Sequence, residues 1–274
     1  MRGRFAAAAA SYDEAAVLAR HTGARMAERL DYVKVAPGRV ADIGCATGDG
    51  IRELQRRYPA ALPLAIDYAS PMLLATHARA TLKDRITRRV PRLLAADVRA
   101  VPLAAGSLDL AWSNLMLHWL DDPLPAFREL HRVLAVGGLF MFAMLGPDTL
   151  KELRAAAAKV SLGDTARRFH DMHDIGDMLV AAGFADPVMD MEMVRLNHGS
   201  PRRLLADQRH LGVRDALLGQ RPWREWRRVF AAWDRIEGVL PASFEVVFGH
   251  AWKAAPRTDA EGRAVISFRP RLTG

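Results

Sequence analysis

Cysteine is nearly absent from this chain, which holds one, Cys45, among 274 residues. A single thiol cannot form an intramolecular disulfide, and it excludes a metal site built from cysteines alone. The cysteine content therefore favours a reducing compartment, and we expect a cytoplasmic protein. Cys45 lies in a turn of small residues, where a small side chain fits for steric reasons alone.

Long apolar runs and targeting signals are also missing. The longest uncharged apolar run, residues 133–145, contains two glycines and is shorter than a bilayer span. Arg2 and Arg4 precede an alanine run, but Asp13 and Glu14 follow too soon for that run to serve as a signal peptide. We therefore expect neither a membrane segment nor a signal peptide.

Acidic residues are fewer than basic ones. The chain has 39 Lys and Arg against 31 Asp and Glu, a formal net charge of +8. Nine arginines lie in one late segment: Arg202, Arg203, Arg209, Arg214, Arg221, Arg224, Arg227, Arg228 and Arg235. Such a segment attracts an acidic protein, a nucleic acid or a phosphate-bearing ligand, although a solvated helix face would show the same pattern.

The most informative stretch covers residues 40–50. An apolar strand ends at Ile43 and runs into a turn of small residues between Gly44 and Gly50, and a second strand closes on Asp67. Small residues let a backbone approach a nucleotide, and an acidic residue at this distance accepts hydrogen bonds from ribose hydroxyls. The spacing fits a dinucleotide as well as S-adenosylmethionine (SAM).

Strands and helices alternate through the first half of the chain. We expect strands at 39–43, 62–67, 92–96, 108–113 and 138–145, separated by helices at about 48–58, 70–80 and 123–134. This alternation predicts an α/β fold with a doubly wound, mostly parallel sheet. Right-handed crossovers then bring the strand ends to one rim of the sheet, at Gly44, Asp67, Asp97 and Asn114.

We expect a single domain over residues 1–274. A leading helical segment (1–38) precedes the cofactor-binding core (39–146), and helical lid or substrate segments follow at 147–182 and 201–237. A strand at 187–196 and a last strand at 243–252 enclose the second of these segments, which should lie above the active rim of the sheet.

Four further motifs resemble those of class I SAM-dependent methyltransferases. They are the helix start at 68–73, the acidic strand end at 96–98, the stretch 106–119 and the glycine turn at 134–138. The resemblance covers residues 39–145 and implies a Rossmann-like fold, SAM as cofactor and S-adenosyl-L-homocysteine as product. It places the methionine end of SAM at Asp42, Gly44, Ala46, Thr47 and Gly48, the ribose at Asp67 and Tyr68, the adenine at Asp97 and Val98, and the methyl group near Asn114.

Two positions depart from this family. Ala46 stands where a second glycine is usual, and Ala135-Val136 replace a basic residue and proline. If residue 46 needs a positive φ, alanine costs about 1 kcal/mol there and its methyl group crowds the cofactor.

The ends of the chain resemble the malonyl-acyl-carrier-protein O-methyltransferases of biotin synthesis. The resemblance rests on residues 5–31, 142–154, 172–184 and 244–252. It implies an SN2 methyl transfer to the free carboxylate of malonyl-acyl carrier protein, with an acidic carrier as partner and no metal. A carboxylate is ionised at neutral pH, so no general base is needed, and the rate should come from alignment and desolvation.

Candidate catalytic and substrate-binding residues follow from this resemblance. Tyr12 is a candidate for closing over the cofactor, or else a packing residue, and His118 lines the acceptor pocket or is a structural histidine. Arg202, Arg203 and Arg209 are the candidates for substrate binding, and the sequence leaves open which arginine holds the carboxylate.

Other functions fit parts of the sequence. Residues 117–119 and 144–150 resemble equally the SAM-fold proteins that hydroxylate an arginine during assembly of respiratory complex I. A non-catalytic assembly or binding protein on the same fold is a further alternative. A nucleic-acid methyltransferase is disfavoured, because the chain has neither an Asn/Asp-Pro-Pro-aromatic motif nor an aromatic and basic stacking array.

Overall fold

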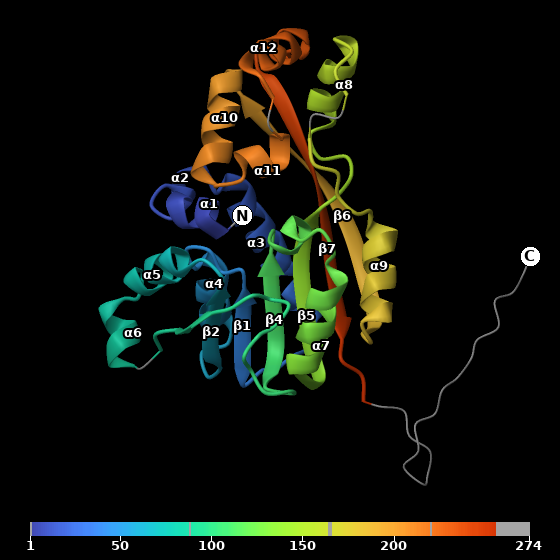
Figure 1. Ribbon diagram of the computed structural model, residues 1–274. Helices are drawn as coiled ribbons and strands as arrows, with labels where there is room; N and C mark the ends of the chain where they lie inside the picture. The colour runs from blue at the N-terminus through green and yellow to red at the C-terminus, as the bar shows by residue number, and fades with distance from the viewer. Residues whose placement is uncertain (1, 88, 164–165, 220, 256–274) are drawn as a thin grey trace, which may run out of the picture.

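The computed structural model describes residues 2–87, 89–163, 166–219 and 221–255. Its central sheet contains, in chain order, β1 (Arg39–Ile43), β2 (Leu62–Asp67), β3 (Arg92–Ala95), β4 (Leu108–Asn114), β5 (Leu134–Leu145), β6 (Ala185–His198) and β7 (Leu240–Trp252). The strand order is β3-β2-β1-β4-β5-β7-β6 (Figure 1). The first five strands pair in parallel and β7 runs antiparallel to both of its neighbours. The predicted α/β, doubly wound fold is confirmed.

Helices precede, connect and cover these strands. They are α1 (Arg2–Ala8), α2 (Tyr12–Ala15), α3 (Val17–Arg29), α4 (Asp49–Arg57), α5 (Ser70–Ala78), α6 (Leu82–Ile86), α7 (Leu124–Val133), α8 (Lys151–Lys159), α9 (Met172–Ala181), α10 (Pro201–His210), α11 (Arg214–Leu218) and α12 (Trp223–Ala232), with short 3-10 turns η1 (Leu30–Tyr32) and η2 (Leu117–Trp119). None of the helices in the described ranges is long and apolar enough to cross a membrane.

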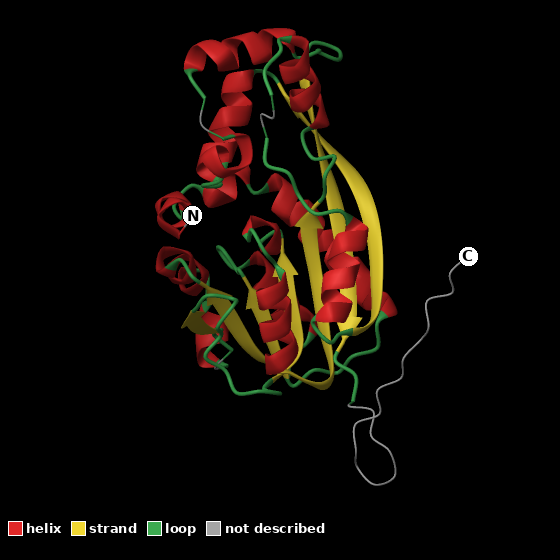
Figure 2. Cartoon of the chain, turned by 45° about the vertical axis from the view of Figure 1, so that its right-hand side comes forward, coloured by secondary structure: helices red, strands yellow, loops and turns green. Residues whose placement is uncertain are grey.

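Helices cover both faces of the sheet (Figure 2). Each face has its own apolar core. On one face α3 and α4 bury Met26, Ile51 and Leu54 against strand residues that include Trp112. On the other face α7 and α9 pack around Phe127 and Phe140. This arrangement leaves the carboxyl edge of the parallel strands open for a ligand.

The two long antiparallel strands extend beyond that edge. The segment between β6 and β7 carries α10, α11 and α12, which lie above the parallel strands, and α12 packs on α8 (Figure 1). α10 contacts α2 of the leading segment. The insertion therefore lies above the rim, as the sequence predicts.

Several element boundaries differ from the prediction. Within the described residues, the segment 147–182 contains two helices, because 160–163 and 166–171 are not helical, and 201–237 contains three. Gly212 ends α10 with φ +75°, and a Cβ there would lie 2.9 Å from the Arg4 carbonyl oxygen of α1. β6 and β7 are longer than expected.

Candidate cofactor and acceptor site

A cavity of about 560 Å³ lies above the carboxyl edge of the sheet. Its floor includes the four predicted rim residues Gly44, Asp67, Asp97 and Asn114, and its roof includes residues of α1, α2, α10 and α11. The four strand ends therefore meet around one ligand-sized space, as the sheet topology predicts.

The turn after β1 brings its backbone to the cavity. Gly44 and Cys45 donate their N–H groups to the Ile66 carbonyl oxygen at 2.8 and 3.1 Å, which fixes the turn against β2. Gly44 has φ +73°, and a Cβ there would lie 2.3 Å from Cγ of Met116. Glycine is needed at this position for both its conformation and its lack of a side chain.

Ala46 lines the cavity in a left-handed conformation, with φ +46°. The structure therefore places it in the conformation in which alanine is disfavoured. Its N–H donates to Oδ2 of Asp67 at 3.1 Å.

Asp67 is fixed at the end of β2 with its carboxylate beside the turn. Oδ1 accepts from the Ala69 N–H at 2.8 Å, while burial raises the pKa of the carboxyl group. An ionised carboxylate keeps further acceptor positions after these bonds, so Asp67 can still receive hydroxyl groups. Tyr68 lines the same part of the cavity, and burial together with the nearby Asp67 raises the pKa of its phenol to about 12.

The second acidic rim residue, Asp97, has a partner of its own. Arg99 donates from Nε and an NH2 group to the two Asp97 oxygens at 3.0 and 2.6 Å, and this contact lowers the pKa of Asp97. Asp97, Val98 and Arg99 all line the cavity. Val98 supplies a buried apolar wall next to this ion pair.

Asp42, Thr47 and Gly48 lie outside the cavity lining. Asp42 is 2% exposed and lies beneath the start of α4, where a Cβ on Gly50 would approach its Oδ2 to 2.6 Å. Burial raises the pKa of Asp42 to about 7. Asp42 supports the turn from below, whereas the resemblance implied that all three residues shape the methionine end of the pocket.

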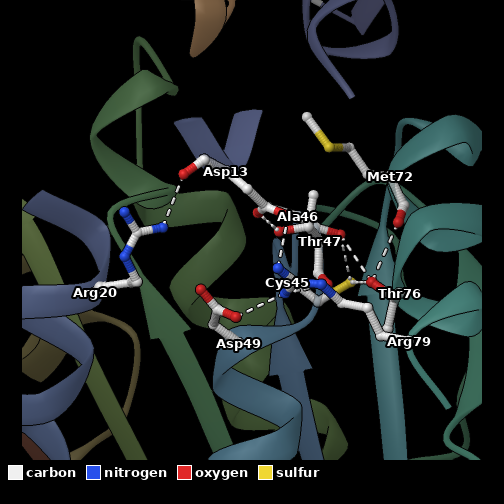
Figure 3. Close-up of polar contacts among 9 residues, drawn as sticks. All are labelled: Asp13, Arg20, Cys45, Ala46, Thr47, Asp49, Met72, Thr76 and Arg79. Carbon is white, nitrogen blue, oxygen red and sulfur yellow. Dashed lines mark hydrogen bonds and ion pairs between the residues drawn. The ribbon is translucent and has the colours of Figure 1, made fainter. Parts of the chain in front are cut away.

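A polar network that the sequence did not indicate holds the leading segment over this turn (Figure 3). Oδ1 of Asp13 accepts from the Thr47 hydroxyl, and its Oδ2 accepts from Arg79, both at 2.6 Å. Arg79 also donates to the Thr47 carbonyl oxygen at 2.9 Å and to Asp49 at 2.6 Å. We call these four residues, Asp13, Thr47, Asp49 and Arg79, the Asp13 network. The only sequence signal was the position of Asp13 next to Tyr12.

The two catalytic candidates line the cavity, and burial shifts the pKa of each away from neutral pH. Burial and the nearby Asp67 raise the pKa of Tyr12, so its hydroxyl keeps its proton. Burial, with Arg167 nearby, lowers the pKa of His118 to about 3. The Leu145 N–H donates to Nδ1 of His118 at 3.3 Å, so this histidine is neutral and serves as an acceptor that holds the end of β5.

Asn114 lies on the cavity floor but its amide is engaged with α3. Nδ2 donates to the Ala19 carbonyl oxygen and Oδ1 accepts from the Thr22 hydroxyl, both at 2.7 Å. Asn114 therefore joins the end of β4 to the leading segment.

Among the three candidate arginines, Arg203 lines the cavity, whereas Arg202 and Arg209 do not. Other residues of the same region, which the sequence did not single out, also line it: Asn197, His198, Gly199, Asp207, Gln208 and Leu211. No motif spacing marks them, because they come from the end of β6 and one face of α10.

The donor set fits SAM. The cavity has room for a nucleoside, and its lining offers acceptors at Asp67, a turn whose backbone approaches closely, and apolar walls at Ile66 and Val98. Within the described residues, no group of three or more His, Cys, Asp or Glu side chains is placed to hold a metal ion.

Comparison with known sequences assigns the family. A methyltransferase domain family matches residues 41–142. The malonyl-[acyl-carrier protein] O-methyltransferase of Gallionella capsiferriformans is 46% identical, covering 97% of this chain and 94% of that protein. The enzyme of the same name from Laribacter hongkongensis is 45% identical over 98% of this chain and 95% of its own length, and that from Legionella pneumophila is 37% identical over 94% and 92%. The chain belongs to the malonyl-[acyl-carrier protein] O-methyltransferase family.

Solved structures agree at the level of the fold. The YcgJ protein of Bacillus subtilis has a TM-score of 0.61 at 14% identity, covering 86% of this chain and 99% of that one. The [4+2]-cyclase SpnF has a TM-score of 0.54 at 18% identity, covering 84% and 82%. A cyclase shares this fold, so the structural likeness shows a class I methyltransferase architecture and does not show an activity. The assignment to the malonyl-[acyl-carrier protein] O-methyltransferases rests on the full-length sequence identity.

Proposed function

We propose that this protein transfers the methyl group of SAM to the free carboxylate of a malonyl thioester on acyl carrier protein, the esterification that biotin synthesis requires. The observation that carries the proposal is the 46% identity over 97% of the chain, since it includes the insertion as well as the SAM-binding core. None of the relatives named above is a hydroxylase, so no observation favours the complex I alternative.

In this reaction, bound SAM supplies a methyl group on a positively charged sulfur. The acceptor carboxylate is already ionised, so the reaction needs no general base, and burial raises the pKa of Tyr12 and lowers that of His118. The chain's contribution is alignment and exclusion of water under the roof of α1, α2 and α10. Asp67 holds the ribose, the turn from Gly44 to Ala46 holds the methionine end, and Asp97 and Val98 bind the adenine.

Tyr12 and His118 act as positioning residues in this scheme. The Tyr12 hydroxyl keeps its proton and can donate a hydrogen bond into the cavity, while His118 fixes the end of β5 beside the reacting groups. Arg203 meets an anionic group of the acceptor, and Arg202 and Arg209 belong to the surface that attracts the acidic carrier. The single buried thiol, Cys45, supports a cytoplasmic location.

Mass spectrometry of malonyl-carrier protein incubated with this protein and SAM tests the proposal. We expect a gain of one methyl group that is lost in Asp67→Ala, while Asp234→Asn, at a surface carboxylate, retains it. The product should form without oxygen. Binding of SAM in a calorimeter with no mass change would refute the substrate assignment and favour a hydroxylase or an assembly protein.

A further inference from the structure

The cavity has a second part that the cofactor residues do not account for. It runs along the end of β6 and one face of α10, and we call it the α10 arm. It is lined by Asn197, His198, Gly199, Arg203, Asp207, Gln208, Leu211, Leu217 and Phe244. Because one cavity contains both these residues and Asp67, the α10 arm communicates with the cofactor site.

Burial changes along the α10 arm from a solvent-exposed opening to a closed interior. Asn197, Gly199 and Arg203 are exposed, whereas His198 is 6% and Gln208 is 5% exposed. The α10 arm is therefore a passage from the protein surface to the SAM-binding end, not a pocket enclosed on all sides.

The walls of the passage combine apolar surface with a few fixed polar groups. Leu217 and Phe244 are buried and apolar, and Gln208 adds an amide among them. Nε2 of His198 lies 3.3 Å from Oδ2 of Asp207, which orients the imidazole. Apolar walls with few polar groups suit a slender chain that contains amides, which needs both kinds of contact.

The charge at the opening is positive. Arg203 is exposed there, and its guanidinium forms no hydrogen bond or ion pair with another residue of the described ranges, since its one contact, to Ser200, is made by the backbone N–H. A guanidinium at this place can make charge-assisted hydrogen bonds to a phosphate group. The reacting carboxylate, in contrast, must lie deep in the cavity beside the methyl group.

We propose that the α10 arm receives the pantetheine chain that links the malonyl thioester to its carrier protein, with Arg203 binding the phosphodiester at the opening. This inference rests on the proposed function, and it assigns the occupant of a passage that SAM does not fill. Amides of the pantetheine chain contact the interior polar groups, and the thioester reaches the cofactor end.

Obstruction of the opening tests the path. A Cβ added to Gly199 meets no atom within 4 Å, so Gly199→Phe introduces a bulky side chain at the rim without local strain. The acceptors to compare are malonyl-pantetheine and malonyl ethyl thioester, which lacks the chain. The value of kcat/KM is measured with each of them as the substrate. We expect kcat/KM for malonyl-pantetheine to fall at least about tenfold and that for the ethyl thioester to stay within about twofold.

A bulky change elsewhere controls for general effects. Gly176 of α9 also has open space around its Cβ position and lies outside the cavity, so Gly176→Phe should leave both acceptors unaffected. SAM affinity, measured by calorimetry, should match that of the wild type in both variants.

Removal of the Arg203 charge tests whether this residue binds the phosphate of the acceptor at the opening. Arg203→Gln should lower kcat/KM for malonyl-phosphopantetheine by about tenfold and leave malonyl-pantetheine unchanged, because only the first acceptor carries the phosphate. Arg128→Gln, at an exposed arginine of α7, is the matched control and should change neither value. An equal loss for both acceptors would show that Arg203 binds the malonyl carboxylate instead.

Failure of the proposed methyl transfer can be distinguished from failure of the assignment of the α10 arm. If the wild type methylates none of the malonyl acceptors, including the carrier-bound one, the proposed function is wrong. If the wild type methylates them and Gly199→Phe changes kcat/KM equally for malonyl-pantetheine and malonyl ethyl thioester, the assignment of the α10 arm is refuted and the proposed function is unaffected.

Discussion

Two residues of the turn after β1 share a left-handed backbone but differ in side chain. Ala46 has φ +46° and Gly48 has φ +92°. Changing Ala46→Gly removes strain of about 1 kcal/mol, part of which is offset by the greater freedom of glycine in the unfolded chain. We expect the free energy of unfolding in urea to rise by up to about 1 kcal/mol, and the SAM dissociation constant to fall by up to about fivefold.

The companion change at the same turn should act in the opposite direction. In Gly48→Ala the new Cβ would lie 2.7 Å from Cγ2 of Thr76, so strain and overlap together should lower the free energy of unfolding by about 3 kcal/mol.

Weaker SAM binding in Ala46→Gly would contradict the first of these predictions. It would show that the Ala46 methyl group, which packs near Met72, contributes more to SAM binding than the backbone strain costs.

Asp42 should make stability depend on pH. Its pKa is about 7 in the folded protein, against 3.8 as the ordinary value. Between these values the folded state holds a proton that the unfolded chain has lost, so the free energy of unfolding falls as pH rises, by up to about 1.4 kcal/mol per pH unit. The side chain of Asn cannot ionise, so the free energy of unfolding of Asp42→Asn should not fall with pH for this reason.

Urea unfolding of Asp42→Asn and wild type at about pH 4.5 and about pH 8 measures the effect. The stability of the variant relative to wild type should increase between the two by about 2–4 kcal/mol, a range that follows from the size of the shift. Comparing the two proteins cancels the other titrating groups. A difference that does not change with pH would mean that Asp42 is ionised in the folded protein across this range.

At the scale of the element, the leading segment closes the cofactor site through the Asp13 network. The Asp13 side chain is 44% exposed, so its bonds are partly screened and contribute about 1 kcal/mol at most. Asp13→Ala should therefore weaken SAM binding by about fivefold and speed amide hydrogen exchange in α1 and α2, with little change in global stability. Calorimetry and exchange mass spectrometry measure the two effects.

Glu28 of α3 provides the control for this prediction. Its carboxylate is 57% exposed, pairs with Arg25 of the same helix and lies outside the cavity, so Glu28→Ala should alter neither quantity. If Asp13→Ala speeds exchange but binds SAM normally, the leading segment does not retain the cofactor.

Periodic elements could be predicted from the sequence, and contacts between distant segments could not. The alternation of strands and helices predicted a helix at 123–134, where α7 lies, and the strand ends predicted the rim, because both depend on local patterns. The Asp13 network joins residues 66 positions apart, and nothing local marks Arg79 as the partner of Asp13. The α10 arm escaped prediction for the same reason.

Part of the sequence similarity to the methyltransferase family reflects packing between strands and not the cofactor site. Residues 146–149 contributed to the family resemblance, yet in the fold they fasten β5 to β7. The Gly146 N–H donates to the Glu245 carbonyl oxygen at 2.9 Å, and the Asp148 N–H donates to Oε2 of Glu245 at 2.6 Å. A Cβ on Gly146 would lie 2.5 Å from Cδ of Glu245, so packing alone accounts for this glycine.

At the scale of the whole molecule, the arginines of the insertion divide into two groups. Arg214 and Arg221 pair with carboxylates, and Arg228 and Arg235 donate to backbone carbonyl oxygens. Within the described ranges, five others on α10 and α12 make neither hydrogen bonds nor ion pairs through their side chains: Arg202, Arg203, Arg209, Arg224 and Arg227. This second group leaves positive charge available above the site for an acidic carrier.

Long-range attraction by this charge should appear in the rate with carrier protein and not with a small acceptor. Reversing Arg224 and Arg227 of α12 to Glu should lower kcat/KM for malonyl-carrier protein by about tenfold at low salt, because electrostatic steering acts on encounter. The same variant should retain its kcat/KM for malonyl-pantetheine. Salt raised to about 0.5 M should reduce the wild-type rate toward that of the variant, since screening removes the same attraction.

Reversal of charge elsewhere separates steering from net charge. Arg85 of α6 and Arg128 of α7 are exposed and lie away from the insertion, so changing both to Glu alters the total charge by the same amount. That variant should keep the wild-type rate with carrier protein if the location of the positive charge decides recognition. Equal losses in the two variants would mean that the overall charge of +8 attracts the carrier and that α12 has no special part. A loss confined to the α12 variant would place the carrier over the insertion, next to the opening of the α10 arm.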